Sequence, residues 1–117
     1  MGFAMLRGWL AEFPSGLRIT VTEPRPGPEL RVLAQEGRIA LSGGVARETD
    51  ILVMAVKPQV ACEVARTVSG FAGARTLVMS IMAGIGLGDL AAMFPHARAF
   101  IRAMPNLPAS VGQGAVA

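Results

Sequence analysis

The chain has 117 residues, of which 52% are hydrophobic, and a formal net charge of +3 at pH 7. Its length fits one domain or part of one, its single cysteine excludes an internal disulfide, and its scattered arginines with only 5% aromatic residues argue against nucleic-acid binding. No apolar run approaches the ~20 residues of a membrane span and no signal-peptide pattern is present, so we expect a cytoplasmic protein without membrane insertion.

Strand-like and helix-like segments alternate along the chain. The first segment, 1–13, is expected to be a helix with one apolar face at Phe3, Leu6, Leu10 and Phe13. Strands are then expected at 18–22, 38–41, 51–56, 76–81 and 97–104, and helices at 28–37, 59–69 and 87–94. The unbroken apolar run at 51–56 predicts a strand that is buried on both faces. This alternation predicts an α/β fold with a parallel sheet.

The helix expected at 59–69 has an apolar side formed by Val60, Val64 and Val68. Cys62 lies among apolar neighbours in the same segment and is expected to be a packing residue. No second cysteine and no paired histidine accompany it, so the sequence predicts neither a metal site nor a redox site.

Small and polar residues follow four of the predicted strands. They are Glu23-Pro24-Arg25, Lys57-Pro58, Ala83-Gly84 and Met104-Pro105-Asn106. Ligands of open parallel sheets bind beyond the carboxyl ends of the strands. Lys57 offers a compact cation for a phosphate or a ribose hydroxyl, Gly84 allows a flat ligand to approach the backbone, and Asn106 offers an amide. Gly2 opens a helix whose N-terminus would suit a diphosphate. A solvated surface charge is the alternative interpretation of Lys57.

Three segments, "AVKPQ" (55–59), "SIMAGI" (80–85) and "RAMPNLPASVGQG" (102–114), together resemble the pyrroline-5-carboxylate reductase family. The resemblance covers essentially the whole chain, although Leu107 stands where the family usually has threonine. It implies a Rossmann-like, doubly wound, mainly parallel sheet, with residues 1–117 as a partial dinucleotide-binding domain. The family's first strand, which is central in the order 3-2-1-4-5-6, and its C-terminal helical domain are expected to lie outside this chain.

The resemblance also implies a function, the reduction of 1-pyrroline-5-carboxylate to L-proline with NADPH or NADH. The cofactor contacts that it implies are Gly2, Glu23, Arg25, Ser42, Val56, Lys57, Pro58, Ala83, Gly84 and Asn106. Glu23 favours a free ribose 2′-hydroxyl and Arg25 accommodates a 2′-phosphate, so both cofactors stay open. The family forms its homo-oligomers through the C-terminal domain. No catalytic acid or base can be named from these residues.

Two alternatives to this function are a different NAD(P)-dependent enzyme of the β-hydroxyacid dehydrogenase type and a non-catalytic remnant of a nucleotide domain.

Without the central strand, the strands at 18–22 and 51–56 would each keep unpaired backbone groups. Each buried unpaired group costs about 1–3 kcal/mol, against a typical domain stability of about 5–15 kcal/mol. We therefore expect these 117 residues alone to be marginally stable, inactive and poor at binding the cofactor.

Overall fold

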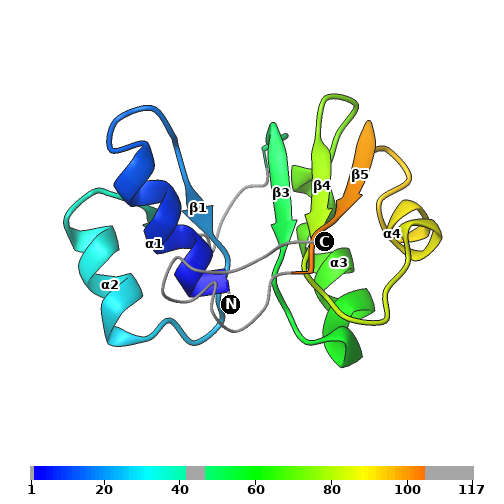
Figure 1. The fold of residues 1–117 in the computed structure, drawn as a ribbon, viewed down its shortest axis with the longest axis horizontal. Coiled ribbons are helices and arrows are strands. Elements are labelled where there is room, and N and C mark those ends of the chain that lie inside the picture. The colour runs from blue at the N-terminus through cyan, green and yellow to red at the C-terminus, as the bar shows by residue number, and fades with distance from the viewer. Residues whose placement is uncertain (1, 42–46, 105–117) are drawn as a thin grey trace. The chain divides into compact units, whose positions relative to one another are not determined.

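The computed structural model describes residues 2–41 and 47–104. Its elements are α1 (Gly2–Glu12), β1 (Thr20–Val21), α2 (Pro28–Gln35), β2 (Ala40–Leu41), β3 (Ile51–Met54), the 3-10 helix η1 (Pro58–Val60), α3 (Ala61–Val68), the 3-10 helix η2 (Ser69–Phe71), β4 (Leu77–Ser80), α4 (Leu87–Met93) and β5 (Ala99–Arg102) (Figure 1). The chain divides into a first unit, Leu6–Val45, and a second unit, Met1–Met5 with Ala46–Ala117. The predicted α/β alternation with parallel strands is confirmed.

The first unit holds two short parallel strands, β1 and β2, which pair Thr20 with Ala40. Leu6 and Leu10 of α1 are buried, as expected, whereas 54% of Phe13 is exposed because α1 ends before it. Helix α2 begins at a proline, whose fixed φ suits the first helical position. It ends just before Gly37, whose φ of +72° is the left-handed conformation common after helix C-termini. The predicted start and stop of this helix are therefore confirmed to within two residues.

The second unit holds a three-stranded parallel sheet in the order β3-β4-β5. Its register aligns the last residues of the three strands, Met54, Ser80 and Arg102. The three strands lie side by side and point to the same edge of the sheet (Figure 1). The loops that follow the three strands therefore leave the sheet on the same side, at the carboxyl ends of the strands, which we call the carboxyl edge.

The core of the second unit lies on one face of this sheet. Met54 and Val78 join the buried residues of α3 and α4 in one cluster. The prediction that 51–56 is buried on both faces is wrong for the described residues, since 56% of Ile51 is exposed and only Met54 of β3 is buried. The reason for this exposure lies in the tertiary structure. Both α3 and α4 pack into the same cluster, and β3 has only β4 as a neighbour among the described strands.

The apolar side that the sequence predicts for the segment 59–69 is confirmed at Val64 and Val68, which pack in or against the core cluster, and is wrong at Val60. Ala61, Ala65 and Val68 are buried, whereas 41% of Val60 is exposed. Val60 lies in η1, where the tighter 3-10 turn places side chains at a different angle from those of the α-helix. Cys62 is exposed, so the prediction that it packs is wrong as well. It follows the buried Ala61 by one position, and neighbouring residues of a helix do not share a face.

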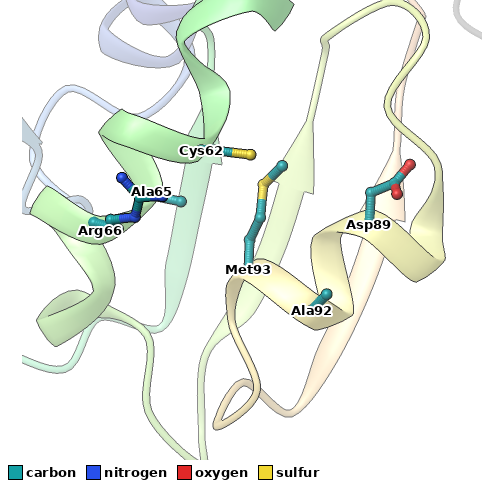
Figure 2. A pocket seen from close by; sticks show the side chains of 6 residues that line it. All are labelled: Cys62, Ala65, Arg66, Asp89, Ala92 and Met93. Carbon is teal, nitrogen blue, oxygen red and sulfur yellow. The ribbon is translucent and has the colours of Figure 1, made fainter.

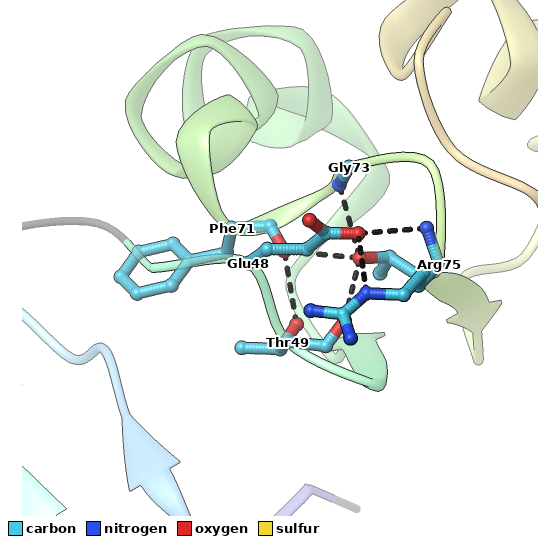
Figure 3. A network of polar contacts seen from close by, with 6 residues as sticks. Glu48, Thr49, Phe71, Gly73 and Arg75 are labelled. Atoms are coloured by element: carbon cyan, nitrogen blue, oxygen red, sulfur yellow. Dashed lines mark hydrogen bonds and ion pairs between the residues drawn. The ribbon is translucent and has the colours of Figure 1, made fainter.

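A hydrogen-bond network closes the opposite edge of the sheet, where β3 and β4 begin (Figure 3). Thr76 is fully buried, and its hydroxyl accepts a hydrogen bond from the Gly73 N–H at 3.0 Å. The same hydroxyl donates to the carbonyl of Thr49 or Phe71. Thr49 donates to the Phe71 carbonyl through its N–H at 2.8 Å and its hydroxyl at 3.0 Å. These bonds tie the loop after α3 to the starts of both strands.

An exposed ion pair lies beside this network. Glu48 accepts a hydrogen bond from the Arg75 backbone N–H at 2.7 Å, and its Oε1 is 3.7 Å from the Arg75 Nε (Figure 3). Because 79% of the Arg75 side chain is exposed, water screens the charges and the pair contributes little stability. The buried hydroxyl of Thr76 is therefore the more important contact at this edge.

Candidate functional site

The three loops that leave the carboxyl edge of the three-stranded sheet form the candidate site. Backbone hydrogen bonds continue just past the strand ends, from the Ile81 N–H to the Met54 carbonyl at 3.2 Å and from the Ala103 N–H to the Ser80 carbonyl at 2.8 Å. The chain then departs through Lys57, through the turn at 83–84 and through Met104. The three loops therefore begin from one hydrogen-bonded line of backbone.

Lys57 is exposed at the point where β3 passes into the next helical segment. Its backbone is extended, with φ −67° and ψ 139°, and its carbonyl accepts the Val60 N–H at 3.1 Å. Pro58 follows as the first residue of η1, and the half-buried Val56 packs against the core cluster. Within residues 2–41 and 47–104 the Lys57 ammonium has no ion-pair partner. This loop presents a solvated cation beside an apolar side chain.

Ala83 and Gly84 are both exposed and form the turn after β4. Gly84 has a φ of +75°, a conformation that L-residues with a side chain adopt only at a cost. Among the described residues nothing beyond its chain neighbours lies within 4 Å of the place where a Cβ on Gly84 would be, so that part of the structure leaves the surface above it open. The turn therefore offers bare backbone to a flat ligand.

Gly2 lies against the exit of β3. A Cβ on Gly2 would be 2.9 Å from the Cβ of Ala55, closer than real Cβ contacts. Both residues belong to the second unit. Glycine at this position is thus required by close approach to the backbone that leads into Lys57.

The four remaining predicted contacts lie in the first unit or outside the described residues. Glu23 and Arg25 follow β1 in the first unit, where the Arg25 N–H donates to a Glu23 carboxylate oxygen at 3.1 Å. Ser42 and Asn106 lie outside the described residues. The second unit therefore gathers six of the ten predicted contacts, which are Gly2, Val56, Lys57, Pro58, Ala83 and Gly84.

A separate groove of about 350 Å³ lies between α3 and α4 (Figure 2). It is lined by Cys62, Ala65, Arg66, Asp89, Ala92 and Met93. All of these belong to the helical layer, and none belongs to the loops of the carboxyl edge.

In the described part of the chain no group of three or more His, Cys, Asp or Glu could hold a metal ion. None of the helices described there is long and apolar enough to cross a membrane.

Ser80 is a residue of this site that the sequence reasoning missed. It is 1% exposed at the end of β4, and its hydroxyl oxygen accepts a hydrogen bond from the Met82 N–H at 3.1 Å. A hydroxyl within the otherwise apolar run 77–81 was the available signal. A buried polar side chain needs a partner, and here the partner is the backbone of the turn that follows.

Comparison with known proteins identifies pyrroline-5-carboxylate reductases among the relatives of this chain, and no protein-family model matches it. The chain is 37% identical over 119 residues to the pyrroline-5-carboxylate reductase of Escherichia coli K12, with 97% of this chain and 44% of that protein covered. It is similar to the structure of a pyrroline-5-carboxylate reductase from Coxiella burnetii, with a TM-score of 0.82, 26% identity, and 98% and 44% of the two chains covered. It is also similar to the Plasmodium falciparum enzyme with NADP bound, with a TM-score of 0.72, 26% identity, and 99% and 42% covered. The chain spans less than half the length of these relatives.

Proposed function

The chain belongs to the pyrroline-5-carboxylate reductase family and matches the N-terminal portion of its members, and we propose that the full-length protein reduces 1-pyrroline-5-carboxylate to L-proline. The cofactor is NADPH or NADH, and residues 1–117 form part of the domain that binds it. The observation that carries this proposal is the common edge from which the loops at Lys57, Ala83-Gly84 and Met104 depart. The protein acts in the cytoplasm and forms homo-oligomers through its C-terminal domain.

The residues at this edge fit a nicotinamide dinucleotide. The exposed ammonium of Lys57, which has no ion-pair partner in the part of the chain that the structure describes, suits a phosphate or a ribose hydroxyl. The open backbone above Gly84 and the apolar side chain of Val56 suit the flat face of a nicotinamide ring. When bound, the cofactor supplies the hydride, and the chemistry of its ring is its own. The part of these residues is to hold the ring at one orientation, which is the main protein contribution to such a reaction.

The choice between the two cofactors is assigned to Glu23 and Arg25. A carboxylate there binds a ribose 2′-hydroxyl, and an arginine binds a 2′-phosphate. The hydrogen bond from the Arg25 N–H to a Glu23 carboxylate oxygen holds the carboxylate near its own loop and involves the Arg25 backbone, not its guanidinium. Ser42, Pro58 and Asn106 are also proposed as cofactor contacts.

We also propose that the two sheets belong to one doubly wound Rossmann sheet whose first strand lies outside these 117 residues. The carbonyls of Asp50 and Met54 accept hydrogen bonds from the β4 side, at 2.9 and 3.2 Å. In a parallel strand the backbone groups of alternate residues face opposite sides, so those of Ile51 and Val53 face away from β4. A structure of the full-length protein would show a parallel strand hydrogen-bonded to Ile51 and Val53. A β3 with no strand paired on that side would contradict the proposal.

The function is tested with the purified full-length protein. It should consume NADPH or NADH with 1-pyrroline-5-carboxylate as the second substrate, as followed by the absorbance of the reduced cofactor. Lys57→Gln should raise the Kd for the preferred cofactor roughly five-fold, whereas Lys57→Arg, which keeps the charge, should bind nearly as well. Oxidation of a β-hydroxy acid without reduction of 1-pyrroline-5-carboxylate would support the other class of dehydrogenase. Absence of both activities and of cofactor binding would indicate a non-catalytic remnant.

A further inference from the structure

Ser80 is buried at the point where the three loops of the candidate site meet. Its carbonyl accepts the Ala103 N–H, which ties the exit of β5 to β4. The next residue, Ile81, donates its N–H to the Met54 carbonyl, which ties the exit of β3 to the same place. The Ser80 hydroxyl then accepts the Met82 N–H and fixes the direction in which the chain continues. One residue and its neighbour thus connect all three exits.

The hydroxyl is not needed to fill space. Alanine has nearly the volume of serine, and a residue with only a methyl group would satisfy the core as well. Burying a hydroxyl costs free energy unless it is hydrogen-bonded, so its presence is explained by the bond it makes. That bond satisfies the N–H of Met82, a residue that is itself only 2% exposed. The turn at 81–84 is therefore held in part by the Ser80 side chain, through its hydrogen bond to the Met82 N–H.

We propose that Ser80 is a positioning residue, which orients the Ala83-Gly84 turn toward the bound cofactor through the Met82 N–H. The inference rests on the proposed function, because it gives the turn a cofactor to face. The hydroxyl itself does not reach the cofactor, since it is 1% exposed inside the unit. Its effect passes through two residues of backbone to Gly84, whose φ is +75°.

The test measures cofactor binding without substrate in the full-length protein, by titrating the fluorescence of the reduced nicotinamide. Ser80→Ala should raise the Kd roughly five-fold or more, because the turn loses its preferred orientation. Thr76→Val is the matched control, since it removes a buried hydroxyl from the other end of the same segment and lies away from the cofactor edge. It should leave the Kd within about two-fold of the wild type.

Amide hydrogen exchange gives a second reading that needs no cofactor. In Ser80→Ala the amides of Met82 to Gly84 should exchange faster than the loss of global stability accounts for, whereas in Thr76→Val their exchange should rise no more than that loss accounts for. Ser80→Cys, with similar size and a weaker acceptor, should shift both measurements in the same direction and serves if Ser80→Ala does not fold. An unchanged Kd in the Ser80 variants, or an equal rise in Thr76→Val, would overturn the positioning role and leave the proposed function intact. A wild type that binds neither cofactor would overturn both.

Discussion

The fully buried hydroxyl of Thr76 should contribute strongly to the stability of the second unit. Thr76→Val keeps the shape of the side chain and removes the oxygen. The Gly73 N–H, 3.0 Å away, then loses its acceptor, and the Thr49 carbonyl loses a donor. The Phe71 carbonyl is less affected, because it still accepts two hydrogen bonds from Thr49. Gly73 is half-buried, and one orphaned donor beside the fully buried Thr76 corresponds to a loss of about 1–3 kcal/mol in the free energy of unfolding.

Urea unfolding followed by circular dichroism measures this loss, provided that the slope with denaturant is the same in both proteins. Thr67→Val is the matched control, because the Thr67 hydroxyl also makes a hydrogen bond, at 3.3 Å to the Glu63 carbonyl, but is exposed to water. Its removal should change the free energy of unfolding by less than about 0.5 kcal/mol. If Thr76→Val and Thr67→Val lower the free energy of unfolding equally, burial does not determine how much the Thr76 hydrogen bonds stabilise the protein, and the reasoning fails.

Two further predictions use pairs of glycines. Gly2→Ala should lower the melting temperature because its new Cβ would meet the Cβ of Ala55 at 2.9 Å, whereas Gly8→Ala, with nothing within 4 Å, should raise the free energy of unfolding by up to about 1 kcal/mol through helix propensity. Gly84→Ala and Gly37→Ala should each cost about 1–2 kcal/mol in urea unfolding, because their φ values are +75° and +72°. Of this second pair, only Gly84→Ala should also raise the cofactor Kd in a fluorescence titration, and an equal rise in both would show that the turn has no special role.

The order of strands and helices followed from the sequence alone. Hydrophobic period, prolines and glycines act over a few residues, so Pro28 and Gly37 were sufficient to mark the two ends of α2. The placement of Lys57 and Gly84 at one edge followed from the same information, because parallel strands present their carboxyl ends together. The family resemblance predicted from the short segments around these residues is confirmed.

Only the tertiary structure decided which side of each element is buried and which polar groups are paired. The sequence pattern predicted the exposed Val60 as part of the packed face and overlooked the buried hydroxyls of Thr76 and Ser80. The Thr76 hydroxyl finds a partner in the Thr49 carbonyl, 27 positions away in the chain, which no local pattern can reveal. Burial and hydrogen bonding depend on strand register and on the helices above the sheet, and both are fixed only when distant segments pack together.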